Sequence, residues 1–540
     1  MKVLIIGGVA AGTKVAAKLK RDNFELDVTI LTKSKDISYA GCGLPYYVGN
    51  VIQEANKLIV NTPDSFHKLT GVNVLVETEV TQVNPEEKYV EAICLKTQEK
   101  MRCEYDKLVI ASGAEAVRPN IEGADLDNVF FMRTPEDAYV LRDAIETGNI
   151  KRAVIVGGGY VGLEIAENLN SQGVRAVVID MAKHILPGFD DEISEYVENH
   201  LAEQGIPILT EIRLEAILGD GKVEKIKTDR RAMKADAVIL CVGIKANTEY
   251  LKDSDIDLMP NKTVKVNEYL ETNVKDIYAV GDCATVINRV TNKPYWSPMG
   301  STANIAGRIA AKNIAGKKKA YPGVLGTSVV KLPELNAGRT GLTEKEANEN
   351  GYNAESVVTV VDDKVHYYPD ASSFIVKMIA DKDTKKLLGL QVLGKGQVDK
   401  MVDIAVAAIT MGATLEDVEN MDLAYAPPFS TAIHPFSHTV NILLNKLNGE
   451  FETVTPADFS KEKAEGFKLI DASLSPSIDG AQYLDLAKIK GEVDGLGRDE
   501  KLLLVCAKGK RAYMLQKRLK HFGYTITKVL EGGTTFNDLE

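Results

Sequence analysis

A glycine-rich segment early in the chain constrains the fold more than any other feature. The apolar run 153–156 leads into GGGYVGLEIAENL, where Gly157, Gly159 and Gly162 are spaced as G-x-G-x-x-G, and Asp180 ends the following apolar run. Such glycines permit a tight turn, close approach of the backbone to a pyrophosphate, and close packing of a helix on a strand. An acid roughly 20 residues further on bonds an adenosine ribose and repels a 2′-phosphate. The segment therefore predicts a dinucleotide-binding α/β unit that prefers NADH to NADPH.

A second nucleotide-binding unit is divided between two distant segments. The apolar run 2–6 precedes Gly7 and Gly12, which match the first and third glycines of the motif. Far downstream, Gly281 and Asp282 follow another short apolar run. This pair suits a flavin nucleotide, since the glycine admits a pyrophosphate and the carboxylate accepts a bond from a ribityl hydroxyl. Because the complete motif lies between these segments, we expect one dinucleotide fold to be inserted in the other.

Composition narrows the class of protein. A chain of 540 residues exceeds one hydrophobic core, so several domains are expected. Its net charge of -11 argues against a nucleic-acid partner, and no apolar run approaches the ~20 residues that span a bilayer. The six cysteines form no CxxC pair and no cluster at metal-ligand spacing. We expect a cytoplasmic protein without metal, membrane or nucleic-acid partners.

Together with the segment SYAGCGLPYYVG at 38–49, the paired nucleotide motifs resemble the FAD- and NAD(P)-dependent pyridine nucleotide-disulfide oxidoreductases. The single cysteine of that segment is similar to that of the coenzyme A-disulfide reductase branch, which is related to NADH oxidases and peroxidases. The resemblance implies two Rossmann-like domains and an α+β interface domain of a homodimer. The implied boundaries are 1–112 with 250–320 for FAD, 113–249 for NADH, and 321–450 for the interface domain.

Cys42 is the residue on which the expected chemistry depends. The residues after it are expected to begin a helix, whose N-terminus stabilises a thiolate and lowers the pKa of the thiol. The resemblance implies that this thiolate lies over the flavin, where Gly41 and Gly43 leave room. Two-cysteine relatives carry C-x4-C, but Tyr47 stands at the second position, so the second sulfur is expected to come from a substrate. Oxidase and peroxidase relatives carry a histidine where this chain has Ala10, which favours a sulfur substrate over oxygen.

The resemblance also assigns the residues that hold the two cofactors. For FAD it implies small residues at strand ends and on one helix, together with the aspartate described above: Gly7, Gly12, Ala111, Gly113, Gly281, Asp282 and Ala303. For NADH it implies the glycine turn, its acid, a tyrosine that gates the nicotinamide and a glutamate that sets its position: Gly157, Gly159, Tyr160, Gly162, Glu164, Asp180 and Gly243.

Further residues are implied for substrate chemistry. Tyr425 and Tyr367 match tyrosines that the branch brings from the partner subunit, with the adjacent Tyr368 as an alternative to Tyr367. Such phenols bond a thiolate and donate a proton to a departing thiol. His434 matches the general acid of glutathione-reductase relatives, the alternative being a structural hydrogen bond. For coenzyme A, similarity suggests four residues whose alternative is an ordinary solvated surface: Lys18, Arg21, Ser38 and Lys68.

The last part of the chain, 454–540, is expected to form a small separate α/β domain. An apolar strand leads into the loop CAKGKR, from Cys506 to Arg511, and apolar residues at helical spacing follow. A loop that opens with cysteine and closes with arginine at a helix start is an anion site that favours thiolate. It resembles the active loop of rhodanese domains, in which the cysteine carries a sulfane sulfur. Because Ala472 stands where those domains often have an arginine, a degenerate module is the alternative.

These inferences combine into one expected function. Electrons pass from NADH through FAD to Cys42, which reduces coenzyme A persulfide, polysulfide or coenzyme A disulfide, while Cys506 handles sulfane sulfur. One alternative is an NADH oxidase that reduces oxygen or peroxide. Another is a sulfurtransferase or sulfur sensor in which the reductase part is vestigial.

Overall fold

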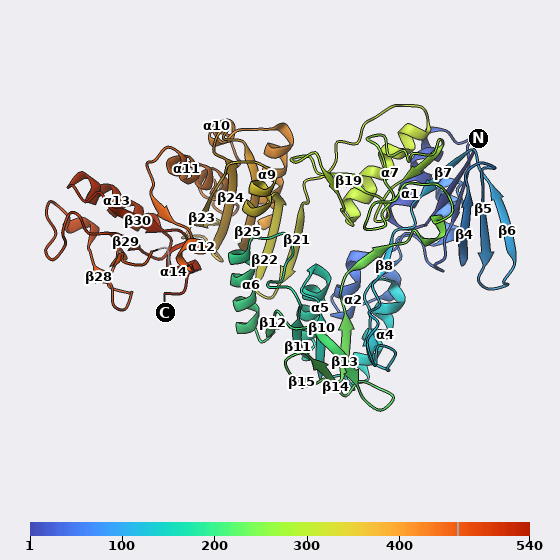
Figure 1. The fold of residues 1–540 in the computed structure, drawn as a ribbon, viewed down its shortest axis with the longest axis horizontal. Helices are drawn as coiled ribbons and strands as arrows, with labels where there is room; N and C mark the ends of the chain where they lie inside the picture. Colours follow the sequence, from blue (N-terminus) through green and yellow to red (C-terminus); the bar gives the residue numbers. More distant parts are fainter. Residues whose placement is uncertain (462–463, 540) are drawn as a thin grey trace. The chain divides into compact units, whose positions relative to one another are not determined.

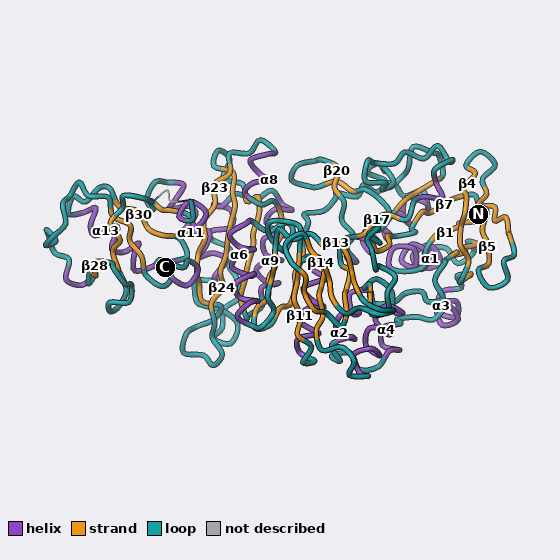
Figure 2. The backbone as a smooth tube through the Cα atoms, turned by 60° about the horizontal axis from the view of Figure 1, so that its bottom comes forward, coloured by secondary structure: helices purple, strands orange, loops and turns teal. Residues whose placement is uncertain are grey.

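The computed structural model describes residues 1–461 and 464–539, which form two compact units (Figure 1). The first unit comprises Met1–Ile185 and Leu201–Val324, and the second comprises Leu186–His200 and Leu325–Glu540. Both units combine helices with strands (Figure 2). The α/β class predicted from the sequence is confirmed.

The first sheet of the first unit is parallel and takes strands from two distant segments. Its order is β18-β7-β1-β2-β3. Helices α1 and α7 pack on one another and cover one face of this sheet. The expected division of this fold is confirmed, because β18 lies beside β7. The elements are β1 (Lys2–Ile6), α1 (Ala10–Asp22), β2 (Asp27–Leu31), β3 (Asn73–Leu75), β7 (Lys107–Ile110), β18 (Ile277–Ala279) and α7 (Gly300–Ile314).

A second parallel sheet is formed entirely by residues that lie between β7 and β18 in the sequence. Its order is β12-β11-β10-β16-β9. The helix α5 begins directly after the glycine turn that follows β10. The predicted insertion of one dinucleotide fold in the other is therefore confirmed. The elements are β9 (Val129–Phe130), α4 (Pro135–Glu146), β10 (Arg152–Val156), α5 (Tyr160–Ser171), β11 (Arg175–Ile179), β12 (Ile208–Leu209) and β16 (Ala237–Leu240).

Short elements complete the first unit. The chain segments that enter and leave the inserted fold pair with one another as the antiparallel strands β8 and β17. Two antiparallel ladders, β4-β5-β6 and β13-β14-β15, accompany the two parallel sheets. The elements are α2 (Leu44–Val48), α3 (Pro63–Thr70), β4 (Thr78–Asn84), β5 (Tyr89–Cys94), β6 (Lys100–Glu104), β8 (Ala114–Ala116), β13 (Leu214–Leu218), β14 (Lys225–Thr228), β15 (Ala232–Lys234), β17 (Ile244–Ala246), β19 (Val286–Ile287) and β20 (Pro294–Tyr295).

An antiparallel sheet forms the centre of the second unit. Its order is β21-β22-β25-β24-β23, and apolar residues of α9 and α11 pack against it. The elements are β21 (Ser328–Leu332), β22 (Leu335–Gly341), α8 (Glu344–Glu349), β23 (Ala354–Asp362), β24 (Ser373–Asp381), β25 (Leu387–Gly394), α9 (Val398–Met411), α10 (Leu415–Glu419) and α11 (Pro435–Leu447).

A buried lysine joins the start of α6 (Asp191–Glu203) to this antiparallel sheet. Lys377 Nζ lies 2.5 Å from Glu192, 2.9 Å from Glu344 and 3.3 Å from Asp190, and its side chain is only 2% exposed. Burial alone would lower the pKa of Lys377, but the three carboxylates raise it. The structure differs here from the expected boundary of the NADH-binding domain, because these ion pairs hold residues 186–200 in the second unit.

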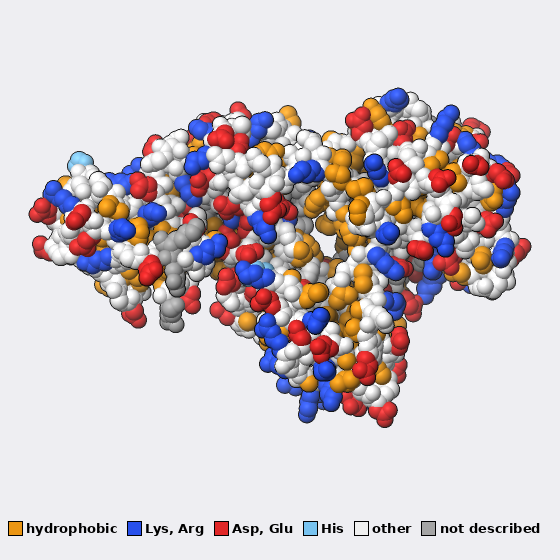
Figure 3. All heavy atoms as spheres, viewed as in Figure 1, with side chains coloured by type: hydrophobic (Ala, Val, Ile, Leu, Met, Phe, Trp, Pro, Cys, Tyr) orange, Lys and Arg blue, Asp and Glu red, His pale blue; other side chains and the backbone are white. Residues whose placement is uncertain are grey.

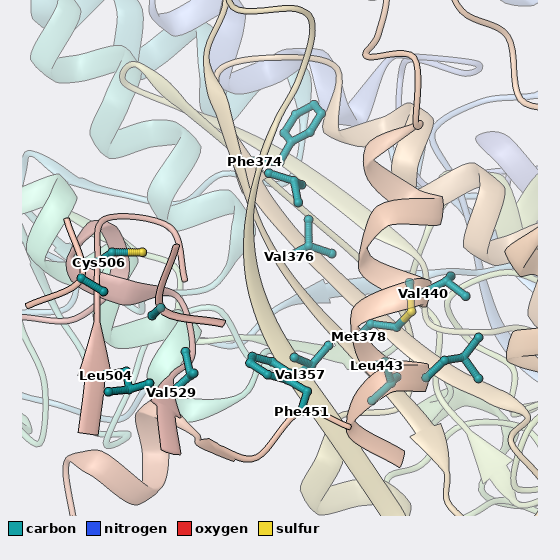
Figure 4. Packing of buried hydrophobic residues seen from close by; sticks show 14 of the residues in the cluster. Val357, Phe374, Val376, Met378, Val440, Leu443, Phe451, Leu504, Cys506 and Val529 are labelled. Atoms are coloured by element: carbon teal, nitrogen blue, oxygen red, sulfur yellow. The ribbon is translucent and has the colours of Figure 1, made fainter. Parts of the chain in front are cut away.

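The C-terminal residues form a parallel sheet of order β26-β30-β29-β27-β28. Its hydrophobic core is continuous with that of the antiparallel sheet, through a cluster that includes Val357, Met378, Phe451, Leu504 and Val529 (Figure 4). The expected separate domain thus shares its packing with its neighbour. The elements are β26 (Thr453–Val454), α12 (Pro456–Phe459), β27 (Lys468–Asp471), β28 (Gln482–Tyr483), β29 (Leu502–Val505), α13 (Lys510–His521), β30 (Thr527–Leu530) and α14 (Gly533–Phe536).

The surface of the protein is charged and mixed in sign. On the face drawn in Figure 3, acidic and basic side chains are interspersed over both units. In the described part of the chain, no helix combines the length and the apolarity needed to cross a bilayer. Within those same residues, no group of His, Cys, Asp and Glu side chains is arranged to hold a metal ion.

Candidate active site

Cys42 lies at the exposed start of a short helix. A 3₁₀ turn at Gly41–Gly43 leads directly into α2, so the predicted helix after the cysteine is confirmed. A Cβ added to Gly41 would meet no atom within 4 Å, whereas one added to Gly43 would lie 3.1 Å from Leu58 Cδ2. Open space for a ligand therefore lies beside Gly41, and Gly43 serves local packing.

The electrostatics around Cys42 differ from the expectation. Partial burial and the charges of Glu164 and Asp282 raise the pKa of the Cys42 thiol, while Arg133 lowers it. The prediction of a lowered pKa is therefore wrong for this structure. The physical reason is that α2 has only five residues, so its dipole is weak, while two carboxylates face the sulfur.

The two glycine turns have the same geometry although their sequences differ. Gly7 has a φ of 107° and Gly157 a φ of 112°, both in the left-handed region. A Cβ on Gly7 would lie 2.1 Å from Ala111 O, and one on Gly157 would lie 2.3 Å from a backbone oxygen. At the third glycines, a Cβ added to Gly12 would lie 1.9 Å from Gly7 O, and one added to Gly162 would lie 2.0 Å from Gly157 O. Both turns therefore fit the phosphates of a dinucleotide.

Asp180 lies at the end of β11, against the second glycine turn. Its carboxylate accepts hydrogen bonds from Gly158 N at 2.6 Å and from Ala182 N at 2.8 Å. A Cβ added to Gly159 or to Gly243 would meet no atom within 4 Å. The turn thus presents open space next to a fixed carboxylate, as a bound adenosine diphosphate requires.

Gly281 and Asp282 follow β18, as predicted. Gly281 has a φ of 82°, and a Cβ there would lie 2.9 Å from Ala11 Cβ and 4.0 Å from Ala303 Cβ. The Asp282 carboxylate forms a 2.6 Å ion pair with Arg133 Nη2. Sequence reasoning missed Arg133, because no motif marks it. The arrangement fits a flavin nucleotide, with Asp282 held in place for a ribityl hydroxyl.

Glu164 and Tyr46 connect α5 to α2. Tyr46 Oη donates a hydrogen bond to Glu164 Oε1 at 3.1 Å. Burial raises the pKa of Glu164 to about 7, and the bond from Tyr46 partly opposes that shift. Sequence reasoning assigned Glu164 to the nicotinamide and missed Tyr46, whose only signal was its position four residues after Cys42.

The predicted substrate tyrosines come together in the second unit. A hydrogen bond with Tyr367 raises the pKa of Tyr425, so the Tyr425 phenol stays protonated near neutral pH. Tyr367 is 66% exposed and Tyr425 is 45% exposed. The ring of the neighbouring Tyr368 lies instead 5.8 Å from Lys364 Nζ. Tyr367 is thus the tyrosine of the adjacent pair that contacts Tyr425.

His434 caps the N-terminus of α11. Its Nδ1 accepts a hydrogen bond from Phe436 N at 3.2 Å, and the residue is buried. Burial, assisted by the charge of Lys400, lowers the pKa of His434 to about 4. A neutral histidine has no proton to give from the accepting nitrogen, so this geometry favours the structural alternative over the general acid.

The lysines suggested for coenzyme A are paired with carboxylates. Lys18 forms an ion pair with Asp22 on α1, beside the exposed Arg21. Lys68 pairs with Asp64 at 2.7 Å on the exposed surface of α3. The Lys68–Asp64 pair is exposed and therefore weak, whereas the Lys18 and Asp22 side chains are only 11% and 21% exposed.

Further cations lie close to Lys18. Slight burial and the charges of Lys319, Arg308 and Lys18 lower the pKa of Lys312 on α7. This cluster, which sequence reasoning missed, joins residues that are far apart in the chain. The fourth suggested residue, Ser38, accepts a 3.4 Å bond from Asn61 Nδ2.

In the C-terminal domain, Cys506 lies at the end of β29 and is only 4% exposed. Gly509 ends the loop with a φ of 82° at the N-cap of α13. Arg511 Nε donates to Ala472 O at 3.0 Å, which ties the loop to the end of β27. A Cβ on Gly533 would lie 1.9 Å from Cys506 O. The predicted loop and the glycine pair that follows β30 are therefore in contact.

The Cys506 loop is also attached to the antiparallel sheet. Lys508 Nζ lies 2.5 Å from Asp362 and 2.7 Å from Ser373 Oγ. Burial and the charge of Lys510 lower the pKa of His438 on α11, while the charge of Asp362 raises it. His438 is thus influenced by the carboxylate that binds Lys508 and by a second lysine of the loop. Figure 4 shows the Cys506 sulfur turned towards that sheet. Side chains of the antiparallel sheet and of α11 thus border the loop.

Two family profiles match the chain. Residues 1–295 match the profile described as pyridine nucleotide-disulphide oxidoreductase, and residues 327–435 match the dimerisation domain of the same family. The chain belongs to the pyridine nucleotide-disulphide oxidoreductases. As a member of this family, the protein is an oxidoreductase that uses FAD and NAD(P)H.

Relatives of this oxidoreductase carry different names. It is 37% identical over 443 residues to the CoA-dependent NAD(P)H sulfur oxidoreductase of Pyrococcus furiosus. The aligned residues make up 82% of this chain and 99% of that protein. It is 34% identical over 451 residues to the NADH oxidase of Methanocaldococcus jannaschii, with 83% and 100% covered. The solved NAD-dependent persulfide reductase of A. fulgidus is similar over 99% of this chain and 100% of that one, with 32% identity and a TM-score of 0.94.

Proposed function

We propose that the oxidoreductase uses electrons from NADH to reduce coenzyme A persulfide, polysulfide or coenzyme A disulfide. The observation that carries this proposal is the exposed Cys42 at the start of α2, where that helix bonds α5 of the inserted dinucleotide fold. Bound FAD supplies a two-electron carrier between a hydride donor and a sulfur. The likeness to a CoA-dependent sulfur oxidoreductase and to a persulfide reductase supports a sulfur substrate.

Cys42 is the nucleophile in this proposal. Its thiolate attacks one sulfur of coenzyme A disulfide, a Cys42–S–S–CoA bond forms, and the other coenzyme A leaves with the electron pair and takes up a proton. Two electrons then cleave the mixed disulfide, which restores the Cys42 thiolate and releases the second coenzyme A as a thiol after protonation. With a persulfide, attack on the outer sulfur releases coenzyme A and leaves a Cys42 persulfide, whose two-electron reduction yields sulfide.

NADH is the proposed nicotinamide donor because of Asp180. Two backbone donors hold its carboxylate against the second glycine turn, where the ribose hydroxyls of NADH would donate hydrogen bonds to it. The same fixed negative charge repels the 2′-phosphate of NADPH. Tyr160, the first residue of α5, is the proposed gate for the nicotinamide.

A homodimer completes the site in this proposal. The match to the family's dimerisation domain supports it, and the exposed, mutually bonded Tyr367 and Tyr425 offer phenols to another subunit. Such phenols bond a thiolate and protonate a departing thiol. All six cysteines, each within the described residues, are free, which suits the reducing cytoplasm that we propose as the location.

The phosphates of coenzyme A are proposed to bind the cations around α1. Lys18 and Arg21 project from that helix, and Lys312 of α7 lies in the same positive field. Asp22 neutralises part of this charge, so a 3′-phosphate would compete with Asp22 for Lys18. Ser38 and Lys68 are proposed to contact the remainder of the substrate.

Stopped-flow kinetics test the substrate. NADH-reduced holoenzyme is mixed with coenzyme A persulfide or coenzyme A disulfide under anaerobic conditions, and in a separate experiment with oxygenated buffer, and flavin reoxidation is followed in each. We expect one of the two coenzyme A compounds to reoxidise the flavin at least about 100-fold faster than oxygen, because Cys42 attacks sulfur directly. Faster reoxidation by oxygen would overturn the proposal and favour the NADH oxidase that the Methanocaldococcus relative suggests.

We further propose that the C-terminal domain is rhodanese-like and handles sulfane sulfur at Cys506. The strand–loop–helix arrangement around Cys506 supports this, as does the similarity of the solved persulfide reductase over 99% of the chain. Arg511 at the start of α13 and the cations of the loop suit an anionic sulfur compound. Fusion to the reductase keeps the transferred sulfur at a high local concentration.

A further inference from the structure

The side chain of Arg142 on α4 reaches the C-terminal end of α2. Its Nη1 donates hydrogen bonds to the carbonyl oxygens of Tyr47 at 3.3 Å, Ile52 at 3.1 Å and Gln53 at 3.1 Å, and its Nη2 donates to Asn50 Oδ1 at 2.9 Å. A guanidinium carries five N–H donors in a planar fork, so one side chain can hold several acceptors in fixed positions. Arg142 therefore ties the last turn of α2 to the segment that leaves it.

The segment that leaves α2 buries little apolar surface. Asn50 has a left-handed φ of 60°, Val51 is 70% exposed, and Gln53 is exposed as well. The helix itself has only five residues, and a helix this short is not stable without tertiary contacts. Carbonyl groups in the last turn of a helix also lack partners within the helix. The position of α2 therefore depends on contacts such as those of Arg142.

Tyr47 adds an aromatic contact to this attachment. Its ring centroid lies 4.4 Å from the Arg142 guanidinium carbon and 5.5 Å from the ring centroid of Tyr139, which meets it edge to face at 75°. Tyr139 also belongs to α4, and Tyr47 is buried. Two-cysteine relatives carry their second cysteine at the position of Tyr47. In this chain, that position serves instead to attach α2 to α4.

A second contact of α2 is with α5. A Cβ added to Gly49 would lie 1.9 Å from Asn168 Oδ1 on α5, and Gln172 Nε2 donates to Gly49 O at 2.9 Å. Two helices of the inserted dinucleotide fold therefore hold α2, although its segment of the chain precedes that fold (Figure 1). Because the turn that contains Cys42 leads directly into α2, a shift of the helix would also move the sulfur.

We propose that Arg142 is a positioning residue for the reaction at Cys42. By holding the end of α2 against α4, its guanidinium fixes the helix that places the Cys42 sulfur for attack on an incoming sulfur and for electron exchange with the flavin. This inference rests on the proposed role of Cys42 as the nucleophile. It assigns that placement to a residue of the inserted fold, 100 positions further along the chain.

Two half-reactions, followed separately by stopped-flow spectroscopy, test the proposed role. The oxidant is whichever of coenzyme A disulfide and coenzyme A persulfide reoxidises the NADH-reduced wild-type holoenzyme faster. We expect Arg142→Met to slow this reoxidation about tenfold, because a misplaced sulfur attacks and exchanges electrons poorly. Reduction of the flavin by NADH should stay within about threefold, since that step does not use Cys42. Arg142→Lys keeps the charge but not the fork, and should slow reoxidation about threefold.

Hydrogen exchange shows, without any sulfur substrate, whether Arg142 holds the helix. Amide hydrogens of residues 44–53 should exchange about tenfold faster in Arg142→Met, because their protection reports the local free energy of opening. The matched control is Glu146→Gln, which removes the carboxylate that lies 2.8 Å from Arg142 Nε but leaves the bonds to α2 in place. Glu146 is 60% exposed, so this variant should change the exchange and both half-reactions less than about twofold.

Three outcomes would overturn the inference. The first is unchanged exchange in Arg142→Met, which would show that other contacts hold α2. The second is faster exchange with both half-reactions slowed by the same factor, and the third is faster exchange with neither slowed. In both of these cases the role of Arg142 would be structural only. Failure of the proposed function is recognised separately, because then neither coenzyme A compound would reoxidise the wild type, and the exchange rates would still decide whether Arg142 holds α2.

Discussion

Replacing Cys42 by serine is expected to lower NADH-dependent reduction of coenzyme A persulfide by at least about 10³-fold, because removal of a nucleophile typically costs that much or more. In the same variant, transfer of sulfur from thiosulfate to cyanide should survive. Cys506→Ser should behave in the opposite way, losing sulfurtransferase activity and keeping NADH-dependent reduction of a directly supplied persulfide. The two cysteines lie in different units, so the two activities should fail separately. Initial rates of both reactions in the two variants provide the test.

A third cysteine supplies the control. Cys94 lies on the antiparallel strand β5, in none of the proposed machinery, and Cys94→Ser should leave both rates within about twofold. Persulfide reduction that persists in Cys42→Ser at near the wild-type rate would contradict the proposed chemistry. Sulfurtransferase activity without any NADH-dependent reduction in the wild type would favour the vestigial reductase.

The second large effect is expected at a buried ion pair that holds the C-terminal domain. Glu531, whose side chain is 0% exposed, lies 2.8 Å from Lys446 Nζ of α11. It also accepts hydrogen bonds from Val358 N at 2.8 Å and from Thr453 Oγ1 at 2.6 Å. Glu531→Ala would leave the buried amide of Val358 without its acceptor and would remove one of the two carboxylates of Lys446, which keeps Glu355 at 2.9 Å. Breaking such a pair costs about 3–5 kcal/mol.

We therefore expect amide hydrogens of β29 and β30 to exchange about 10²–10³ times faster in Glu531→Ala, because their protection reports the local free energy of opening. The exposed pair of Lys395 and Glu334, at 2.9 Å, is the control. Glu334→Ala should cost less than about 1 kcal/mol, since exposed ion pairs contribute little. Unchanged exchange in Glu531→Ala would show that the shared hydrophobic core alone fixes the domain.

The dinucleotide folds were predictable because their constraints are local. A Cβ at Gly7 or Gly157 would collide with a neighbouring strand, so each turn must show glycine in the sequence. Asp180 directly follows β11, and Asp282 comes three residues after the end of β18. A strand followed by a turn and a helix is visible in the sequence as a change in the spacing of apolar residues. The insertion of one fold in the other followed from the order of these segments.

The remaining features depend on contacts that no local pattern encodes. Arg133 meets Asp282 from 149 positions away, and Tyr46 meets Glu164 from 118 positions away. Burial and the carboxylates of Glu164 and Asp282 raise the pKa of Cys42, so the helix dipole alone predicted the wrong direction. His434 carried a family motif, but its cap on α11 and its burial became apparent only in three dimensions.

The central claim is that Cys42 binds the incoming sulfur and exchanges two electrons with the flavin, and a reductive titration tests it most directly. Holoenzyme is treated with coenzyme A disulfide, freed of excess reagent and titrated anaerobically with NADH. The wild type should consume one equivalent of NADH per subunit more than Cys42→Ser and should release one coenzyme A per subunit. The reason is that reduction of the Cys42–coenzyme A mixed disulfide takes two additional electrons. Equal NADH consumption by both proteins, with no coenzyme A released, would contradict the account.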